Sequence, residues 1–189
     1  MKTSHSSGFA GRAVYNGDMV CGGSSFPFIM GATFSRDSSI IYLYGIAGDL
    51  LFRAHQVEGD TVPYLFRYDE SAAVDQRFSE RVRFVMEGLG RNLSIRGLLT
   101  GKLPFAGREG NLFVAGSGYR YKGEGFSVAS DGDMRLKKAK YRLKDFTVRL
   151  KYFYGDGNYH VPSSVEMKLR GCTLTIDVER LYEEELHEG

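Results

Sequence analysis

The chain has 189 residues and a formal net charge of +2; 42% of its residues are hydrophobic and 25% are charged. This length and composition fit one globular domain with a buried core and exclude an intrinsically disordered protein. The small charge excess does not predict a nucleic-acid partner, because nucleic-acid-binding domains usually have a higher isoelectric point and a one-sided basic patch. We therefore expect a single domain over residues 1–189, with residues 1–7 disordered and residues 183–189 forming an acidic tail.

The first third of the chain has the period-two alternation of apolar and polar side chains that is typical of β-strands. In the clearest example, Phe28, Met30 and Phe34 fall on one face of their segment, while Thr33 falls on the other. Turn-forming pairs such as Gly22-Gly23 separate the segments, which favours sequential antiparallel hairpins. The expected strands lie near Phe9 to Tyr15, Phe26 to Phe34, Ile40 to Tyr44, Asp49 to Val57 and Val62 to Tyr68.

A helical period of about 3.6 residues replaces this alternation from Asp75 to Arg91. A second short helical piece is expected from Leu93 to Thr100, and we expect the helical segment as a whole to form a lid over the sheet. Gly88, Gly90 and Gly97 are candidate hinges of this lid, with C-cap or bend roles as the alternative. The apolar stripe of the longer helix consists of Phe78, Val82, Val85, Met86 and Leu89.

The strand pattern returns in the second half of the chain. The apolar parity changes between Leu143 and Phe146, which predicts a bulge or break close to Asp145. A sheet this large around so little helix must curl, so the residues alone predict a half-closed barrel beneath the helical lid. The expected strands lie near Leu112 to Ala115, Tyr119 to Val128, Met134 to Lys138, Tyr141 to Tyr152, Ser164 to Leu169 and Thr173 to Leu181.

Residues suited to catalysis or metal binding are few. The four histidines form no HExxH motif and the serines lie in no GxSxG motif, so we expect no catalytic residue, no metal site, no cofactor and no enzymatic activity. His55 and His160 are expected at the surface of a turn or rim. Cys21 and Cys172 allow at most one disulfide, and a buried free thiol is the favoured expectation for each.

One basic cluster stands out, because no acid interrupts it. It would attract phosphate groups, whether on nucleic acid or on anionic lipid headgroups. The favoured alternative is that basic side chains on exposed strands prevent edge-to-edge aggregation. The cluster consists of Arg135, Lys137, Lys138, Lys140, Arg142 and Lys144.

Three pieces of the chain together resemble a known family. Tyr44 to Phe52 has the form of a turn between two strands, and Ser94 to Pro104 that of a helical segment ending in glycine and Leu-Pro. Val161 to Leu169, followed by Gly171 and Leu174 to Asp177, has the form of a closing hairpin. In their order and spacing these pieces resemble LolB, the bacterial outer-membrane lipoprotein receptor, and the superfamily that it shares with the lipoprotein carrier LolA.

The resemblance implies a mainly β (α+β) fold, an unclosed antiparallel β-barrel of about eleven strands covered by helices, with an apolar cavity for acyl chains. It also implies a signal peptide and an acylated N-terminal cysteine, neither of which is in this sequence, and a location at the periplasmic face of the outer membrane. The protruding leucine of the family maps onto Ala47, so Ile46, Ala47 and Gly48 form the candidate membrane or partner loop.

We therefore expect non-enzymatic binding of the acyl chains of lipoproteins or lipids, for transfer to or retention at the bacterial outer membrane. A periplasmic carrier protein and a membrane surface are further candidate partners, and nucleic acid is not. The alternatives are an envelope structural or protein-interaction module that keeps the fold without transferring lipid, and a lipid hydrolase, which would need a Ser, a His and an acid at the cavity mouth. The expected acyl cavity is lined by Phe28, Met30, Phe34, Val82, Val85, Met86, Leu89, Phe146 and Val148.

Overall fold

The computed structural model describes residues 10–57, 64–68, 80, 93–102, 110–143, 146–156 and 161–183. These residues form one antiparallel sheet of twelve strands and one short helix, α2 (Ile95–Thr100). The strand order is β5-β4-β3-β2-β1-β12-β11-β10-β9-β8-β7-β6, so β5 and β6 are the edges and the sheet does not close. The strands are β1 (Gly11–Cys21), β2 (Ser24–Phe34), β3 (Ser38–Gly45), β4 (Leu50–Val57), β5 (Tyr64–Tyr68), β6 (Gly110–Ala115), β7 (Gly118–Gly123), β8 (Phe126–Ser130), β9 (Leu136–Arg142), β10 (Thr147–Phe153), β11 (Ser164–Leu169) and β12 (Cys172–Glu183).

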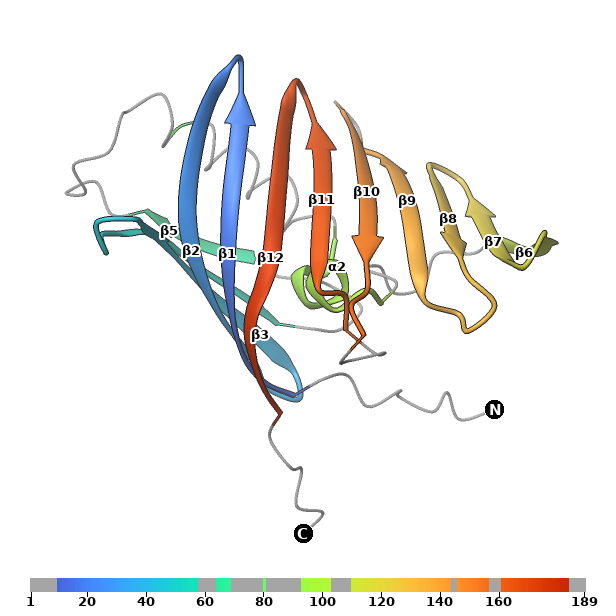
Figure 1. Cartoon of the computed structure of the whole chain (residues 1–189), viewed down its shortest axis with the longest axis horizontal. Coiled ribbons are helices and arrows are strands. Elements are labelled where there is room, and N and C mark those ends of the chain that lie inside the picture. Colours follow the sequence, from blue (N-terminus) through green and yellow to red (C-terminus); the bar gives the residue numbers. More distant parts are fainter. Residues whose placement is uncertain are drawn as a thin grey trace, which may run out of the picture.

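The predicted fold class, a mainly β protein with an unclosed antiparallel barrel and a small helical part, is confirmed. Figure 1 shows the sheet curling around α2, which lies on its concave side. We call this side the inner face and the opposite side the outer face.

The number of strands differs from the prediction because one segment predicted as a single strand forms two strands, β7 and β8. The segment from Tyr119 to Val128 turns back on itself at Glu124 and Gly125, where Gly125 has a φ of 75°, which suits glycine. The predicted break near Asp145 is confirmed as a hairpin connection between β9 and β10. At the β1–β2 hairpin both Gly22 and Gly23 have positive φ, as a two-residue turn between twisted strands requires.

Of the helical segment that is predicted to form a lid, the structure describes mainly the last part. The short helical piece expected from Leu93 to Thr100 coincides with α2. The longer predicted helix lies outside the described residues, except for Glu80, which is helical and exposed, and so do the candidate hinges Gly88 and Gly90. Gly97 lies within α2, and Gly101 takes the C-cap position with a φ of 67°. Gly97 is therefore a helix residue of the described part and not a bend.

The expectation of free thiols is wrong, because Cys21 and Cys172 form a disulfide. Cys21 ends β1, Cys172 begins β12, and the two residues are direct partners in the β1–β12 register. Their Cα atoms are 4.4 Å apart, which is within the range that a disulfide spans. Sequence spacing could not show this, since the two residues are separated by 151 positions.

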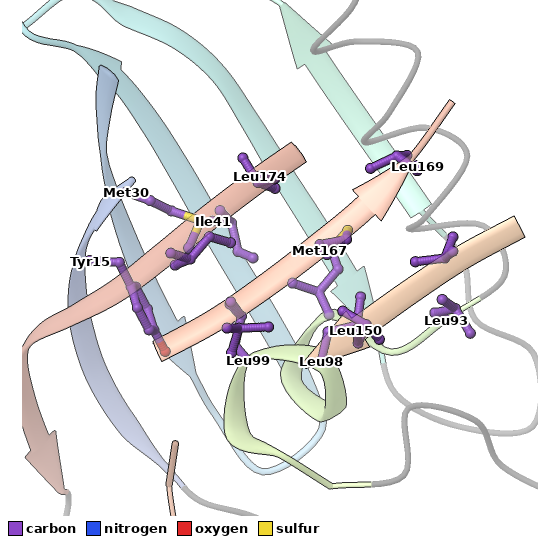
Figure 2. Packing of buried hydrophobic residues seen from close by; sticks show 14 of the residues in the cluster. Tyr15, Met30, Ile41, Leu93, Leu98, Leu99, Leu150, Met167, Leu169 and Leu174 are labelled. Atoms are coloured by element: carbon purple, nitrogen blue, oxygen red, sulfur yellow. The ribbon is translucent and has the colours of Figure 1, made fainter. Parts of the chain in front are cut away.

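The core lies between the inner face of the sheet and α2. Leu98 and Leu99 of α2 are buried against strand residues that include Leu150 of β10 and Met167 of β11 (Figure 2). Burying these apolar side chains stabilises the curled sheet, at about 1.5–3 kcal/mol for each large side chain taken out of water.

Candidate functional site

The site predicted from sequence falls partly on the inner face of the sheet. Phe28, Met30 and Phe34 of β2 and Val148 of β10 are all buried in one hydrophobic cluster. The ring of Phe28 lies against Gly17, its direct partner on β1, at a position where a side chain on Gly17 would collide with the ring. The four predicted residues therefore belong to one apolar surface that spans strands from both halves of the chain.

Phe146 lies at the rim of this surface. It is partly buried and packs against the cluster, and the guanidinium of Arg170 lies 5.1 Å from the centre of its ring. The remaining predicted cavity residues, Val82, Val85, Met86 and Leu89, lie outside the described residues.

The predicted membrane or partner loop is a tight turn between β3 and β4. The amide of Gly48 donates to the carbonyl of Gly45, and the amide of Gly45 donates to that of Asp49. Gly48 has a φ of 87°, which suits glycine. Ile46 is 75% exposed and Ala47 is also exposed, so the turn presents an aliphatic side chain to the solvent.

Sequence reasoning missed the polar residues that fix α2 to the sheet. The buried amide of Gln56 donates to the carbonyl of Leu93 (2.9 Å), and its oxygen accepts from the amide of Ile95 (2.7 Å). The buried guanidinium of Arg96 donates to the backbone carbonyls of Ser35 and Ser38 in the β2–β3 turn. The signal for Arg96 is a lone cation in the apolar run from Ile95 to Leu99, whereas Gln56 carries no comparable signal.

Buried tyrosines are the second group that sequence reasoning missed. Tyr15 and Tyr152 are 1% and 3% exposed, and in the described part of the chain their hydroxyl groups have no hydrogen-bond partner. Burial raises the pKa of both hydroxyls well above the usual value of a tyrosine, and the neighbouring Tyr141 and Tyr154 add to the effect at Tyr152. Burial, assisted by the charge of Asp131, also raises the pKa of Tyr154 to about 12. These hydroxyls therefore stay neutral, so they can donate hydrogen bonds but cannot act as bases.

The described residues hold no group of three or more His, Cys, Asp or Glu side chains close enough to bind a metal ion. His55 lies within β4, opposite Ile40, and is partly buried, while His160 is outside the described residues. Within the described ranges no helix is long and apolar enough to cross a membrane. The chemistry that this arrangement offers is thus apolar contact with a few neutral hydrogen-bond donors.

No protein-family model matches the chain, and no curated protein matches it either. Seven chains of solved structures do match. One is a DUF1329 family protein from Desulfovibrio piger, with a TM-score of 0.42 and 11% sequence identity over 97% of this chain and 89% of the other. At this level of similarity we transfer no property from that protein.

Proposed function

We propose that this protein binds the acyl chains of lipoproteins or lipids against the inner face of its sheet, without catalysing a reaction. The observation that carries the proposal is the apolar surface of Phe28, Met30, Phe34 and Val148, which curves across an open sheet. In the described part of the chain, α2 is the one element that packs on this surface.

Hydrophobic burial alone is strong enough for this role. Each methylene group transferred from water contributes about 0.8 kcal/mol, so about ten buried methylenes contribute about 8 kcal/mol before the costs of ordering are subtracted. Such binding needs no covalent step and no nucleotide. Cargo would leave when another site holds the same chain more tightly.

The hydroxyls of Tyr15 and Tyr152, which have no hydrogen-bond partner among the described residues, add support of a different kind. A buried donor without an acceptor costs about 1–3 kcal/mol, and such groups in native proteins call for an explanation. The ester or amide carbonyl of an acylated ligand would accept these hydrogen bonds. The proposed ligand therefore has a carbonyl group next to its apolar chain.

The proposed location is the periplasmic face of the bacterial outer membrane. The disulfide between Cys21 and Cys172 supports an oxidising compartment such as the periplasm. The resemblance to the LolB family supports the same location and a periplasmic carrier protein as the donor of cargo. In this proposal the exposed Ile46, with Ala47 and Gly48 beside it, contacts that carrier or the membrane.

Fluorescent fatty-acid titration tests the proposal. The unmodified protein is expected to take up the probe saturably, and Phe28→Asp is expected to abolish uptake because it places a charge on the inner face. Ile29→Asp is the matched control, since Ile29 is the next residue on β2 and is 40% exposed. If Phe28→Asp does not fold by circular dichroism, Tyr15→Phe replaces it and is expected to weaken the binding of an acyl ester several-fold while leaving the fold intact. Absence of saturable uptake by the unmodified protein would rule the proposal out.

One observation favours the alternative of an envelope structural or interaction module. Phe34 and Val148 are fully buried and Phe28 and Met30 nearly so, as in a core that the protein fills with its own side chains. A protein of that kind would take up no fatty acid and would carry no lipid when its native mass is measured after purification from bacterial envelopes.

A further inference from the structure

The outer face of strands β7 to β11 is strongly basic. Strand register shows which side chains share this face, because directly opposed residues of antiparallel strands point the same way. Among the described residues of these strands, Glu166 is the one acid on this face, and Glu124 lies in the adjoining β7–β8 turn. The exposed cations, which we call the basic face, are Arg120, Lys122, Lys138, Lys140, Arg142, Arg149, Lys151 and Lys168.

The register places like charges directly opposite one another. Lys138 faces Lys151, and Arg149 faces both Lys140 and Lys168. Like charges at opposed positions destabilise a sheet. Glu166 relieves only part of this repulsion, since its carboxylate lies 3.2 Å from Lys151 and 3.5 Å from Lys168. The stability of the fold therefore does not explain this arrangement.

Protection of a sheet edge does not explain it either. Strands β8, β9, β10 and β11 lie inside the sheet with a neighbour on each side, so they have no edge to protect. The cluster seen in the sequence is also divided by the structure. Arg135 and Lys137 are tied to Asp131 and lie over the ring of Tyr154, whereas Lys138, Lys140 and Arg142 belong to the basic face. Lys144 is outside the described residues.

Two exposed phenylalanines accompany these cations. Phe113 of the edge strand β6 is the direct partner of Arg120, and Phe153 follows Lys151 on the same face of β10. Both are 49% exposed. Cations mixed with exposed aromatic side chains are typical of surfaces that lie on a membrane, where the rings enter the headgroup region.

We propose that the basic face docks on an anionic phospholipid bilayer, with Phe113 and Phe153 entering its interface. Strands are spaced about 4.8 Å apart, so the cations of β7, β9, β10 and β11 extend over a width of about 19 Å, which suits a layer of many headgroups better than one phosphate. The disulfide favours a lipid over a nucleic acid, because oxidising compartments hold anionic membranes and little nucleic acid. This docking surface is separate from the inner face and does not depend on acyl binding.

Vesicle co-sedimentation tests the docking. The protein is expected to sediment with vesicles of phosphatidylglycerol and phosphatidylcholine, and not with vesicles of phosphatidylcholine alone. Binding is expected at about 0.1 M salt and to be lost at about 1 M salt, where the screening length falls from about 10 Å to about 3 Å. The triple variant K138E/K140E/R149E is expected to bind the anionic vesicles at least about tenfold more weakly.

The matched control is R36E/R53E/R180E, which makes the same change in charge at exposed arginines outside the basic face. It is expected to keep the vesicle affinity within about threefold, because these side chains do not face the bilayer in the proposed orientation. The triple variant should fold, because K138E and R149E place a carboxylate opposite Lys151 and Lys168, while K140E and R149E exchange one like-charge pair for another. K138Q/K140Q/R149Q serves if it does not.

The docking surface would be overturned by equal sedimentation with neutral vesicles, by loss of binding in the control, or by tighter binding of a single-stranded oligonucleotide than of the anionic vesicles. Fatty-acid uptake by the triple variant separates the two proposals. If the unmodified protein takes up fatty acid but does not bind vesicles, the docking surface is contradicted and the acyl site is not. If it binds vesicles but takes up no fatty acid, the acyl site is contradicted and the docking surface is not.

Discussion

Asp131 organises the turn between β8 and β9 with both of its carboxylate oxygens. Its Oδ1 accepts from the amides of Asp133 and Arg135, and its Oδ2 accepts from the guanidinium of Arg135 at 2.9 Å. The ammonium group of Lys137 lies 3.3 Å from Oδ2. Partial burial would raise the pKa of Asp131, but the hydrogen bonds from Arg135 and Lys137 and the charge of Arg135 outweigh it and hold the pKa below its usual value.

We predict that Asp131→Asn lowers the free energy of unfolding by about 1–2 kcal/mol at neutral pH. The pKa of Asp131 is lower in the folded than in the unfolded state. Its carboxylate therefore contributes fully to the free energy of unfolding above the unfolded pKa of about 4, and this contribution disappears as the pH falls through the pKa of the folded state. The difference between the two proteins should therefore shrink as urea denaturation is repeated at lower pH. Asp133→Asn is the control, since that carboxylate is 82% exposed, and a loss of equal size there would contradict the prediction.

At the scale of the element, α2 is held by polar contacts as well as by its apolar side. Arg96 is buried and donates to carbonyls of the β2–β3 turn, 2.7 Å from that of Ser38, while its guanidinium lies 5.8 Å from the centre of the Phe34 ring. Ser94 caps the helix by accepting from the amide of Gly97. A helix of this length gains little stability of its own, so these contacts position it.

We predict that Arg96→Met lowers the free energy of unfolding by about 2–3 kcal/mol, because the carbonyls of the β2–β3 turn lose a charged donor that water replaces poorly. Arg53→Met is the matched control. Arg53 is exposed, its guanidinium lies over the ring of Tyr42 at 5.3 Å, and its replacement should cost less than about 1 kcal/mol. Guanidinium chloride denaturation measures both variants, and similar losses would show that Arg96 does not fix the helix.

Local patterns explain why most elements could be predicted from sequence. The alternation in β2 and the glycines after Cys21 determine a strand and its turn without help from the rest of the chain. Tyr119 to Val128 is predicted as one strand although the apolar parity changes between Tyr121 and Phe126, and the turn itself depends on the conformation of Gly125.

The candidate sites show the same division between local and long-range information. Phe28, Met30 and Phe34 share a face by period alone, so their place on the inner face was predictable. The opposition of Arg149 to Lys140 and Lys168 depends on the register of three strands, which no single strand specifies. The pairing of Cys21 with Cys172 depends on register in the same way.

At the scale of the whole molecule, the β1–β12 ladder is the one junction between two half-sheets of the described structure. Strands β1 to β5 lie on one side of it and strands β6 to β12 on the other. Cys21 and Cys172 lie at the end of this ladder and link the β1–β2 and β11–β12 hairpins covalently. The disulfide therefore reinforces the contact on which the single sheet depends.

We predict that Cys21→Ser with Cys172→Ser lowers the free energy of unfolding by about 2–5 kcal/mol, because the disulfide closes a loop of 151 residues and limits the freedom of the unfolded chain. The sheet should still form, since the remaining β1–β12 pairs from Gly11 to Val20 keep their hydrogen bonds. Equilibrium denaturation with and without reductant checks this: reductant should bring the unmodified protein to the midpoint of the double variant and leave the variant unchanged. An unmodified protein whose midpoint is the same in both conditions, with free thiols detected only in reductant, would show that the two half-sheets hold together without the covalent link.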